Sequence, residues 1–145
     1  MPRQTFMHRV VTAAEPAQVW RALQRPESWG RIGGVTKVEQ PQFDAAGELT
    51  GYRFTVQIGG KPHVGTATRS ETTPGRRVAM TLDSDQLGGL IDIELEPAGD
   101  QTAINVAMTV QSKGMMTTVL FPVISGAIAS GFNEAVEEFA SALKD

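Results

Sequence analysis

The chain contains no cysteine among its 145 residues and only two histidines, His8 and His63. The lack of cysteine excludes disulfide bonds, catalysis by a thiolate and almost every structural zinc site. A catalytic zinc site normally takes three protein ligands, and the two histidines fall on separate expected strands. We therefore expect no metal and no other cofactor.

The sequence also lacks the short motifs that mark common catalytic centres. It has no G-x-S-x-G nucleophile elbow, no Walker loop and no G-x-G-x-x-G that opens a helix. No cluster of basic residues with interleaved aromatic residues indicates a nucleic-acid partner. The first eleven residues hold no apolar run long enough for a signal peptide, so we expect a cytoplasmic protein.

Charge is missing from the twenty residues between Gly114 and Asn133. A run of this length could span a bilayer. Pro122, Gly126 and Gly131 make it only moderately hydrophobic, however, and neither a basic flank after it nor a Trp or Tyr at either end marks a membrane interface. The residues favour the other interpretation, a long helix packed against a sheet as one wall of an apolar cavity.

What the chain does contain is typical of one globular domain over residues 1–145. Hydrophobic residues make up 41% and charged residues 20% of the sequence, which are globular values. Residues 1–77 carry eleven Lys/Arg against six Asp/Glu, whereas residues 78–145 carry two against ten. Because the basic residues mostly stand singly, we interpret the asymmetry as two oppositely charged halves that pair within one fold.

Two kinds of periodicity predict the regular elements. Residues 3–12 mix β-branched and aromatic types and are predicted to form a strand. Pro16 opens a short helix, and Pro26 opens a second one that Gly33 ends. Alternating apolar and polar residues, separated by turn sequences such as Gly59-Gly60, then predict six more strands. These strands cover residues 35–40, 49–58, 62–71, 78–82, 91–95 and 104–110.

Such a series of strands predicts an antiparallel meander with one apolar and one wet face. Only the closing segment is long enough to cover the apolar face. Its apolar residues recur at helical spacing, namely Ile128, Phe132, Val136, Phe139 and Leu143. Pro122 predicts a kink or a break in the earlier part of this helix.

Several local patterns accompany this order of elements. They are P-A-Q-V-W-x-A-L at 16–23 with P-E-S-W at 26–29, P-G-R-R at 74–77, and L-E-P-x-G-D-x-T at 95–102. Together they resemble the START-like helix-grip (SRPBCC) superfamily, which includes polyketide cyclase/dehydratase and lipid-transport proteins. The resemblance covers essentially the whole chain. It implies an α+β fold in which a curved seven-stranded antiparallel sheet wraps a long C-terminal helix, with two short helices after strand 1.

In relatives of this kind a cavity between sheet and helix takes small hydrophobic molecules. Small residues crowd the middle of the closing helix here, at Gly126, Ala127, Ala129, Ser130 and Gly131. Either the sheet approaches the helix closely at these positions, or space remains beside it. We expect space, in the form of a mostly apolar pocket.

His63 and Arg69 are the candidate catalytic residues, and they share one face of their strand. If that face lines the cavity, they could act as an acid and an anion-binding group in enolate chemistry. The alternative is an ordinary half-exposed strand histidine, and the alternation does not decide which face is inside. Asp92, Glu94 and Glu96 share a strand face that we interpret as solvated.

The function we expect is binding or carrying of a small hydrophobic ligand, such as a lipid, a polyketide-like or an isoprenoid molecule, without catalysis. One alternative is an enzyme resembling the polyketide cyclases/dehydratases. Another is recruitment of a partner or membrane through residues 115–128, as the resemblance to the carbon monoxide dehydrogenase group of this superfamily implies. If each strand's apolar face is the concave one, the residues predicted to line the cavity are Trp29, Phe54, Val56, Met80, Ile91, Ile93, Met108, Val110, Met116, Leu120, Phe121, Ile124 and Ile128.

Overall fold

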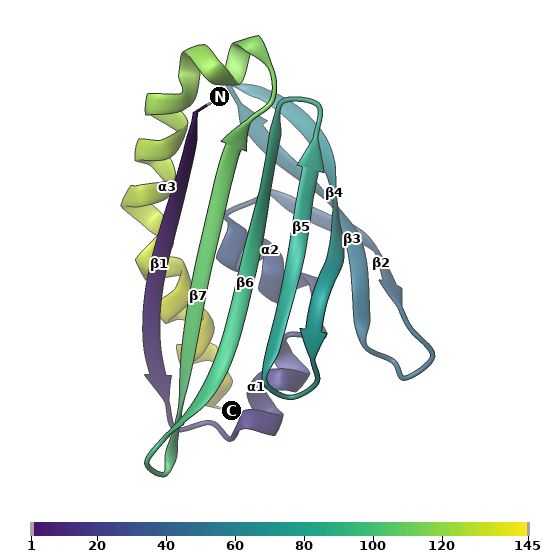
Figure 1. Ribbon diagram of the computed structural model, residues 1–145, viewed down its shortest axis with the longest axis vertical. Coiled ribbons are helices and arrows are strands. Elements are labelled where there is room, and N and C mark those ends of the chain that lie inside the picture. The colour runs from purple at the N-terminus through teal and green to yellow at the C-terminus, as the bar shows by residue number, and fades with distance from the viewer. Residues whose placement is uncertain (1, 145) are drawn as a thin grey trace.

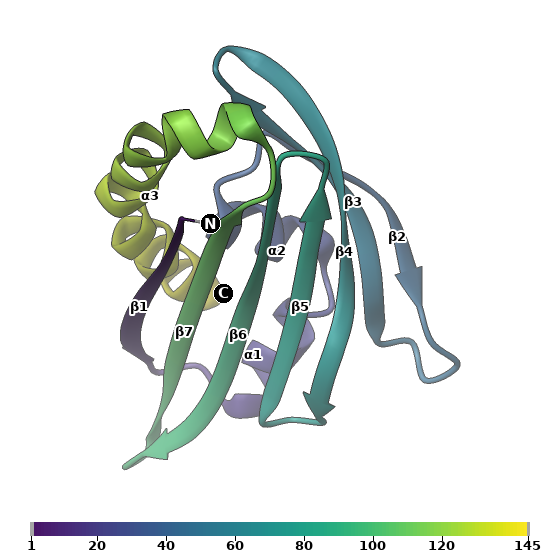
Figure 2. The same ribbon diagram turned by 45° about the horizontal axis from the view of Figure 1, so that its top comes forward.

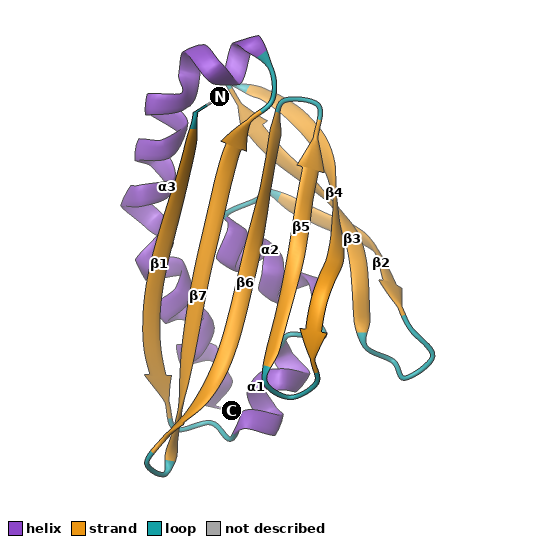
Figure 3. Cartoon of the chain, viewed as in Figure 1, coloured by secondary structure: helices purple, strands orange, loops and turns teal. Residues whose placement is uncertain are grey.

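The computed structural model describes residues 2–144, with side chains up to residue 143. One strand, two short helices, six strands and one long helix follow each other along the chain (Figures 1 and 3). The elements are β1 (Arg3–Thr12), α1 (Pro16–Ala22), α2 (Pro26–Gly33), β2 (Lys37–Phe43), β3 (Leu49–Ile58), β4 (Lys61–Thr73), β5 (Arg77–Ser84), β6 (Leu87–Ala98), β7 (Gln101–Ser112) and α3 (Met115–Ser141), followed by a short 3₁₀ turn, Ala142–Lys144.

The seven strands form a single antiparallel sheet in the order β1-β7-β6-β5-β4-β3-β2. Strands β2 to β7 follow one another as a meander, and β1 returns to pair with β7 at the other edge. The sheet curves, and all three helices lie on the same side of it (Figures 1 and 2). This arrangement confirms the predicted α+β helix-grip fold.

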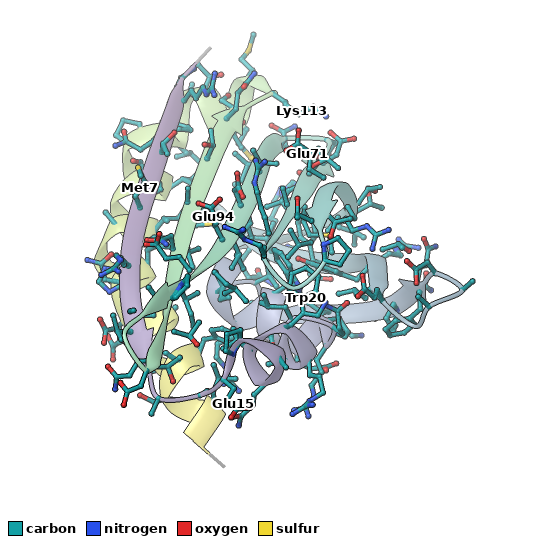
Figure 4. The ribbon with its side chains drawn as sticks, turned by 60° about the horizontal axis from the view of Figure 1, so that its bottom comes forward. Met7, Glu15, Trp20, Glu71, Glu94 and Lys113 are labelled. Carbon is teal, nitrogen blue, oxygen red and sulfur yellow. The ribbon has the colours of Figure 1, made fainter. Side chains whose placement is uncertain are left out.

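Alternation along the strands separates a concave, helix-facing side from an outer side. Met80, Ile91 and Met108 are direct partners on neighbouring strands and are buried on the concave side. On the outer side Arg77 donates to both carboxylate oxygens of Asp92, at 3.0 and 2.7 Å. Met7 and Glu94 project from this side, away from the helices (Figure 4). The acidic strand face is therefore on the outside.

Prolines and glycines set the ends of the short helices. Pro16 and Pro26 stand in the first turn of α1 and α2, where a missing N–H costs no hydrogen bond. Gly34 ends α2 in the left-handed conformation with φ of 69°, which a residue with a Cβ adopts at a cost. Trp29 of α2 is fully buried, and its indole N–H donates to the Leu23 carbonyl at 2.8 Å.

Helix α3 runs without interruption through Pro122. Its first turns run across one end of the sheet before the helix bends and follows β1 toward the C-terminus (Figure 2). The proline therefore produces a bend and no break, in agreement with one of the two outcomes expected for it. The later half of the helix packs into the core through Phe132, Val136 and Phe139.

The start of α3 is fixed to the sheet by polar contacts. Thr117 is fully buried, and its hydroxyl donates to the Gln86 carbonyl at 2.6 Å. Gly59 and Gly60, with φ of 60° and 78°, form the β3–β4 hairpin turn. Leu120 lies against this turn, 3.3 Å from the place of a Cβ on Gly59. The helix is therefore held at both ends, while its middle crosses the concave face.

The outward face of α3 is unexpectedly exposed. Met115, Val119 and Val123, spaced by four residues, are 85%, 74% and 70% exposed. By length and composition alone α3 could cross a membrane, and only 17% of its most apolar window is buried. The charge-free segment thus forms a wall over the sheet, as predicted, but it is not a buried helix because nothing covers its outer side within residues 2–144.

Candidate functional site

A cavity of about 380 Å³ lies between the concave face of the sheet and α3. This volume falls within the range of small-molecule sites. Its lining residues come from α2 and the segment after it, from strands β3, β5, β6 and β7 and the β3–β4 turn, and from the middle of α3. They are Ile32, Gly33, Gly34, Val35, Phe54, Val56, Gln57, Ile58, Gly59, Leu82, Leu87, Gly88, Met108, Val110, Val123, Ile124, Ala127, Ile128, Gly131, Phe132 and Ala135.

The strands supply the floor of the cavity through every second residue. Phe54, Val56 and Ile58 of β3 line it at this spacing, and so do Met108 and Val110 of β7. The ring of Phe54 lies over its strand partner Gly65, where a Cβ would come 2.4 Å from Phe54 Cζ. Glycine at position 65 therefore allows the Phe54 ring to lie where it forms part of the cavity wall.

Helix α3 supplies the roof at helical spacing. Ile124 and Ile128 are four residues apart, as are Ala127 and Gly131, and all four line the cavity. A Cβ on Gly131 would meet nothing within 4 Å. The small residues of α3 therefore leave space beside the helix, and the sheet does not close up to it.

The chemistry of the lining is almost entirely apolar. None of the residues found to line the cavity is ionisable, and Gln57 alone among them has a polar side chain. Burial of apolar ligand surface would supply about 25 cal/mol per Å² removed from water. The cavity is thus suited to holding an apolar molecule, and its lining offers no group that titrates.

The thirteen residues predicted to line the cavity fall into two groups. Six of them line it, namely Phe54, Val56, Met108, Val110, Ile124 and Ile128. The other seven are not among the lining residues: four of them are fully buried in the core, Trp29, Met80, Ile91 and Ile93. The remaining three lie on the first turns of α3, before the part that faces the cavity, and they are Met116, Leu120 and Phe121.

Sequence reasoning missed the lining residues that tertiary packing brings in. Ile32 and Val35 come from the end of α2 and the segment after it, and Leu82 and Leu87 flank the β5–β6 turn. Leu82 continued the alternating pattern of Met80, so a signal for it was present in the sequence. Nothing in the local sequence of Ile32 indicates that α2 closes one side of the cavity.

His63 lies on the concave side, directly opposite the cavity-lining Val56. Its side chain is 14% exposed, and its Nδ1 is 3.3 Å from Asp85 Oδ1. Its Nε2 is buried and has no hydrogen-bond partner among the described residues. A buried polar atom without a partner costs roughly 1–3 kcal/mol, so this atom is an unusual feature of the concave wall.

Arg69 shares that face but belongs to a different site. It is six residues further along β4, a distance of about 20 Å in an extended strand. Its guanidinium lies 3.4 Å from Asp44 Oδ2 and 3.8 Å from Glu48 Oε1, and Glu48 also accepts the indole N–H of Trp20 at 3.0 Å. The structure therefore does not bring the two candidate catalytic residues together.

The Asp44 carboxylate accepts several hydrogen bonds in the β2–β3 turn. Backbone N–H groups of Glu48 and Ala46 donate to Oδ1 at 3.0 and 2.9 Å. The hydrogen bond from Glu48, with smaller contributions from Ala46 and Arg69, holds the pKa of Asp44 below its ordinary value. Arg69 thus stabilises a turn. Across the described residues, no group of three or more His, Asp or Glu side chains could hold a metal ion.

The comparison with protein families agrees with the fold and the cavity. Over residues 3–145 the sequence matches the family described as polyketide cyclase / dehydrase and lipid transport. The chain belongs to this family. Membership confirms the resemblance to START-like proteins that the local sequence patterns indicated. A comparison with curated proteins found no match.

Solved structures of similar fold include both enzymes and proteins without a stated activity. A START superfamily protein from Mycobacterium smegmatis has a TM-score of 0.69 at 16% identity, covering 97% of this chain and 99% of the other. The Zhui aromatase/cyclase from Streptomyces has a TM-score of 0.64 at 14% identity, covering 95% and 94%. Truncated norcoclaurine synthase from Thalictrum flavum has a TM-score of 0.60 at 13% identity, covering 99% and 95%. At these identities this family member shares their fold.

Proposed function

We propose that the protein binds or carries a small hydrophobic ligand, such as a lipid, a polyketide-like or an isoprenoid molecule, between the sheet and α3. The observation that carries the proposal is the cavity of about 380 Å³, whose lining contains no ionisable residue. Affinity then comes from burial of apolar surface. Family membership, with its reference to lipid transport, supports the same function.

An enzymatic function of the cyclase/dehydrase type is the alternative that the family description brings in. A general acid or base must lie within hydrogen-bond reach of the proton that it moves. No acid, base or nucleophile is found among the lining residues, and His63 with Asp85 stands in the wall behind them. We therefore propose binding without catalysis.

The direct test is a titration with N-phenyl-1-naphthylamine, a neutral fluorophore whose emission rises in apolar surroundings. We expect saturable binding of one molecule per chain. A titration without saturation, or with several weak sites, contradicts the proposal. Native mass spectrometry of freshly purified protein complements the titration, because a ligand retained from the cell would identify the chemical class.

Contact of α3 with a lipid surface is a second candidate, supported by one specific observation. Met115 and Val119 form an exposed apolar row in a charge-free segment. The next residue in the row, Val123, is both exposed and part of the cavity lining. A ligand could thus pass between a bilayer and the cavity along this part of the helix.

A further inference from the structure

The residues that line the cavity differ in how far they reach the surface of the molecule. Every lining residue from β5, β6 and β7 is buried or half-buried. Six lining residues are exposed, and they are Gly34, Gln57, Gly59, Val123, Ala127 and Gly131. The cavity is therefore closed on the side of β5, β6 and β7 and reaches solvent where these six residues lie.

The exposed lining residues come from two parts of the chain that meet at this opening. Val123, Ala127 and Gly131 are spaced by four residues and form one row along α3. Gly34 caps the end of α2, and Gly59 lies in the turn between β3 and β4. We call the opening bounded by these five residues the mouth of the cavity.

The mouth is bordered mainly by residues with little or no side chain. Gly34 and Gly59 have φ of 69° and 60°, so their backbone conformation accounts for glycine. Gly131 lies inside α3, where a Cβ would meet nothing within 4 Å. Glycine inside a helix costs up to about 1 kcal/mol relative to alanine. Neither backbone conformation nor packing therefore requires the glycine at position 131.

We propose that the ligand enters and leaves the cavity through this mouth, and that the small residues Ala127 and Gly131 keep the passage open. The inference rests on the proposed binding function and names the part of that site that sets the rate of ligand exchange. None of the five mouth residues is ionisable, so an apolar ligand meets no charged side chain among them. Val123 also belongs to the exposed row of α3, so the mouth opens beside that row.

A residue at the mouth and a residue in the wall have different effects on binding kinetics. A group that narrows the mouth raises the barrier for entry and for exit alike. The association and dissociation rate constants then fall together, and Kd stays nearly the same. A group that fills ligand space instead weakens binding and does not slow dissociation.

The absence of cysteine from the chain allows a bulky group to be attached at one chosen position. The variant Ala127→Cys is treated with methyl methanethiosulfonate or with the larger benzyl methanethiosulfonate, and dithiothreitol removes either group. Stopped-flow fluorescence with N-phenyl-1-naphthylamine measures both rate constants. We expect the benzyl group to lower each of them roughly tenfold and to change Kd by less than about threefold. The methyl group should have a smaller effect.

Dithiothreitol should restore both rates, which shows that the modified variant is folded. Ala129→Cys is the matched control, because Ala129 is an exposed alanine of the same helix that is not among the lining residues. The benzyl group at position 129 should leave both rate constants unchanged.

Each result decides one of the two proposals. Dissociation that is unchanged or faster in benzyl-modified Ala127→Cys, or equal slowing at positions 127 and 129, overturns the mouth and leaves hydrophobic binding intact. Absence of saturable fluorophore binding by the unaltered protein overturns the binding function and, with it, this inference.

Discussion

The ring of Phe54 occupies the space over Gly65 that the side chain of any other residue would fill. The two residues are direct partners on β3 and β4. A Cβ on Gly65 would stand 2.4 Å from Phe54 Cζ and 2.7 Å from the carbonyl oxygen of Asp83. Because Phe54 lines the cavity, this glycine determines the position of one of its walls.

The substitution Gly65→Ala should therefore destabilise the protein by roughly 1–3 kcal/mol, the usual cost of overpacking. The Phe54 ring must move, and the backbone oxygen on the other side cannot. Urea denaturation measures the change. Gly88→Ala is the control, since its Cβ would meet mainly the flexible side chain of Lys113, at 3.3 Å. Equal stability of the two variants contradicts this account of the wall.

Filling the cavity from the helix should weaken binding without unfolding the protein. Gly131 lines the cavity and Gly126 does not, and a Cβ on either would meet nothing within 4 Å. We expect Gly131→Leu to weaken N-phenyl-1-naphthylamine binding by at least about tenfold, because leucine occupies ligand space. Gly126→Leu should bind normally.

Both variants should melt at or above the temperature of the unaltered protein. Glycine inside a helix costs up to about 1 kcal/mol relative to better helix formers. Loss of binding in both variants, or in neither, would show that the ligand lies somewhere other than beside Gly131.

Affinity should grow with the length of an apolar ligand until the cavity is full. Each buried methylene contributes about 0.8 kcal/mol, so each step from 1-hexanol toward 1-decanol should tighten binding about fourfold. Competition with the fluorophore measures the series. An affinity independent of chain length would point to a polar surface site.

Burial of Tyr52 predicts a loss of stability in alkali. Tyr52 is the only tyrosine of the chain and is 4% exposed. Desolvation raises its pKa above the ordinary value of 10.0, so the folded state binds the phenolic proton more tightly than the unfolded state. The corresponding stability is complete below pH 10 and is lost as the pH rises past the pKa of the unfolded chain.

Phenolate absorbance follows this single residue. The folded protein should show no phenolate near pH 10, whereas the protein unfolded in urea should titrate near that value. The variant Tyr52→Phe should lose the part of the alkaline destabilisation that comes from Tyr52 and keep the part that comes from other groups. A folded protein that titrates near pH 10 is at odds with the buried position of Tyr52.

The exposed row on α3 predicts weak binding to lipid vesicles. Met115→Glu and Val119→Glu each place a charge on the row, and both should reduce co-sedimentation with zwitterionic vesicles. Val64→Glu changes an exposed apolar residue on β4, far along the chain from α3, and should have no effect. Equal loss in all three variants would remove the second candidate function.

Much of the fold could be predicted from local sequence. The number of strands and the order of elements follow from local patterns. These patterns are the strict alternation along β6 and β7, the Gly59-Gly60 turn and the prolines that open the two short helices. These signals are local because side-chain period and turn conformation depend on neighbouring residues. The bend at Pro122 follows from its missing N–H in the same way.

The site was only partly predictable, because its shape depends on which residues stand over one another. Met80 and Ile93 alternate correctly with their neighbours, yet they are fully buried in the core and are not among the lining residues. Ile32 lines the cavity only because α2 folds back over the sheet. The face of His63 was undecided in the sequence, and the pairing with Val56 decides it.

The most direct test of the account is to locate a bound apolar probe by NMR, using 2-methylnaphthalene and methyl-labelled protein. We predict intermolecular NOEs to methyl groups on opposite walls, those of Val110 on the sheet and of Ile124 and Ile128 on α3. NOEs confined to Met115 and Val119 on the outer face, or none at saturating probe, would contradict a ligand held between sheet and helix.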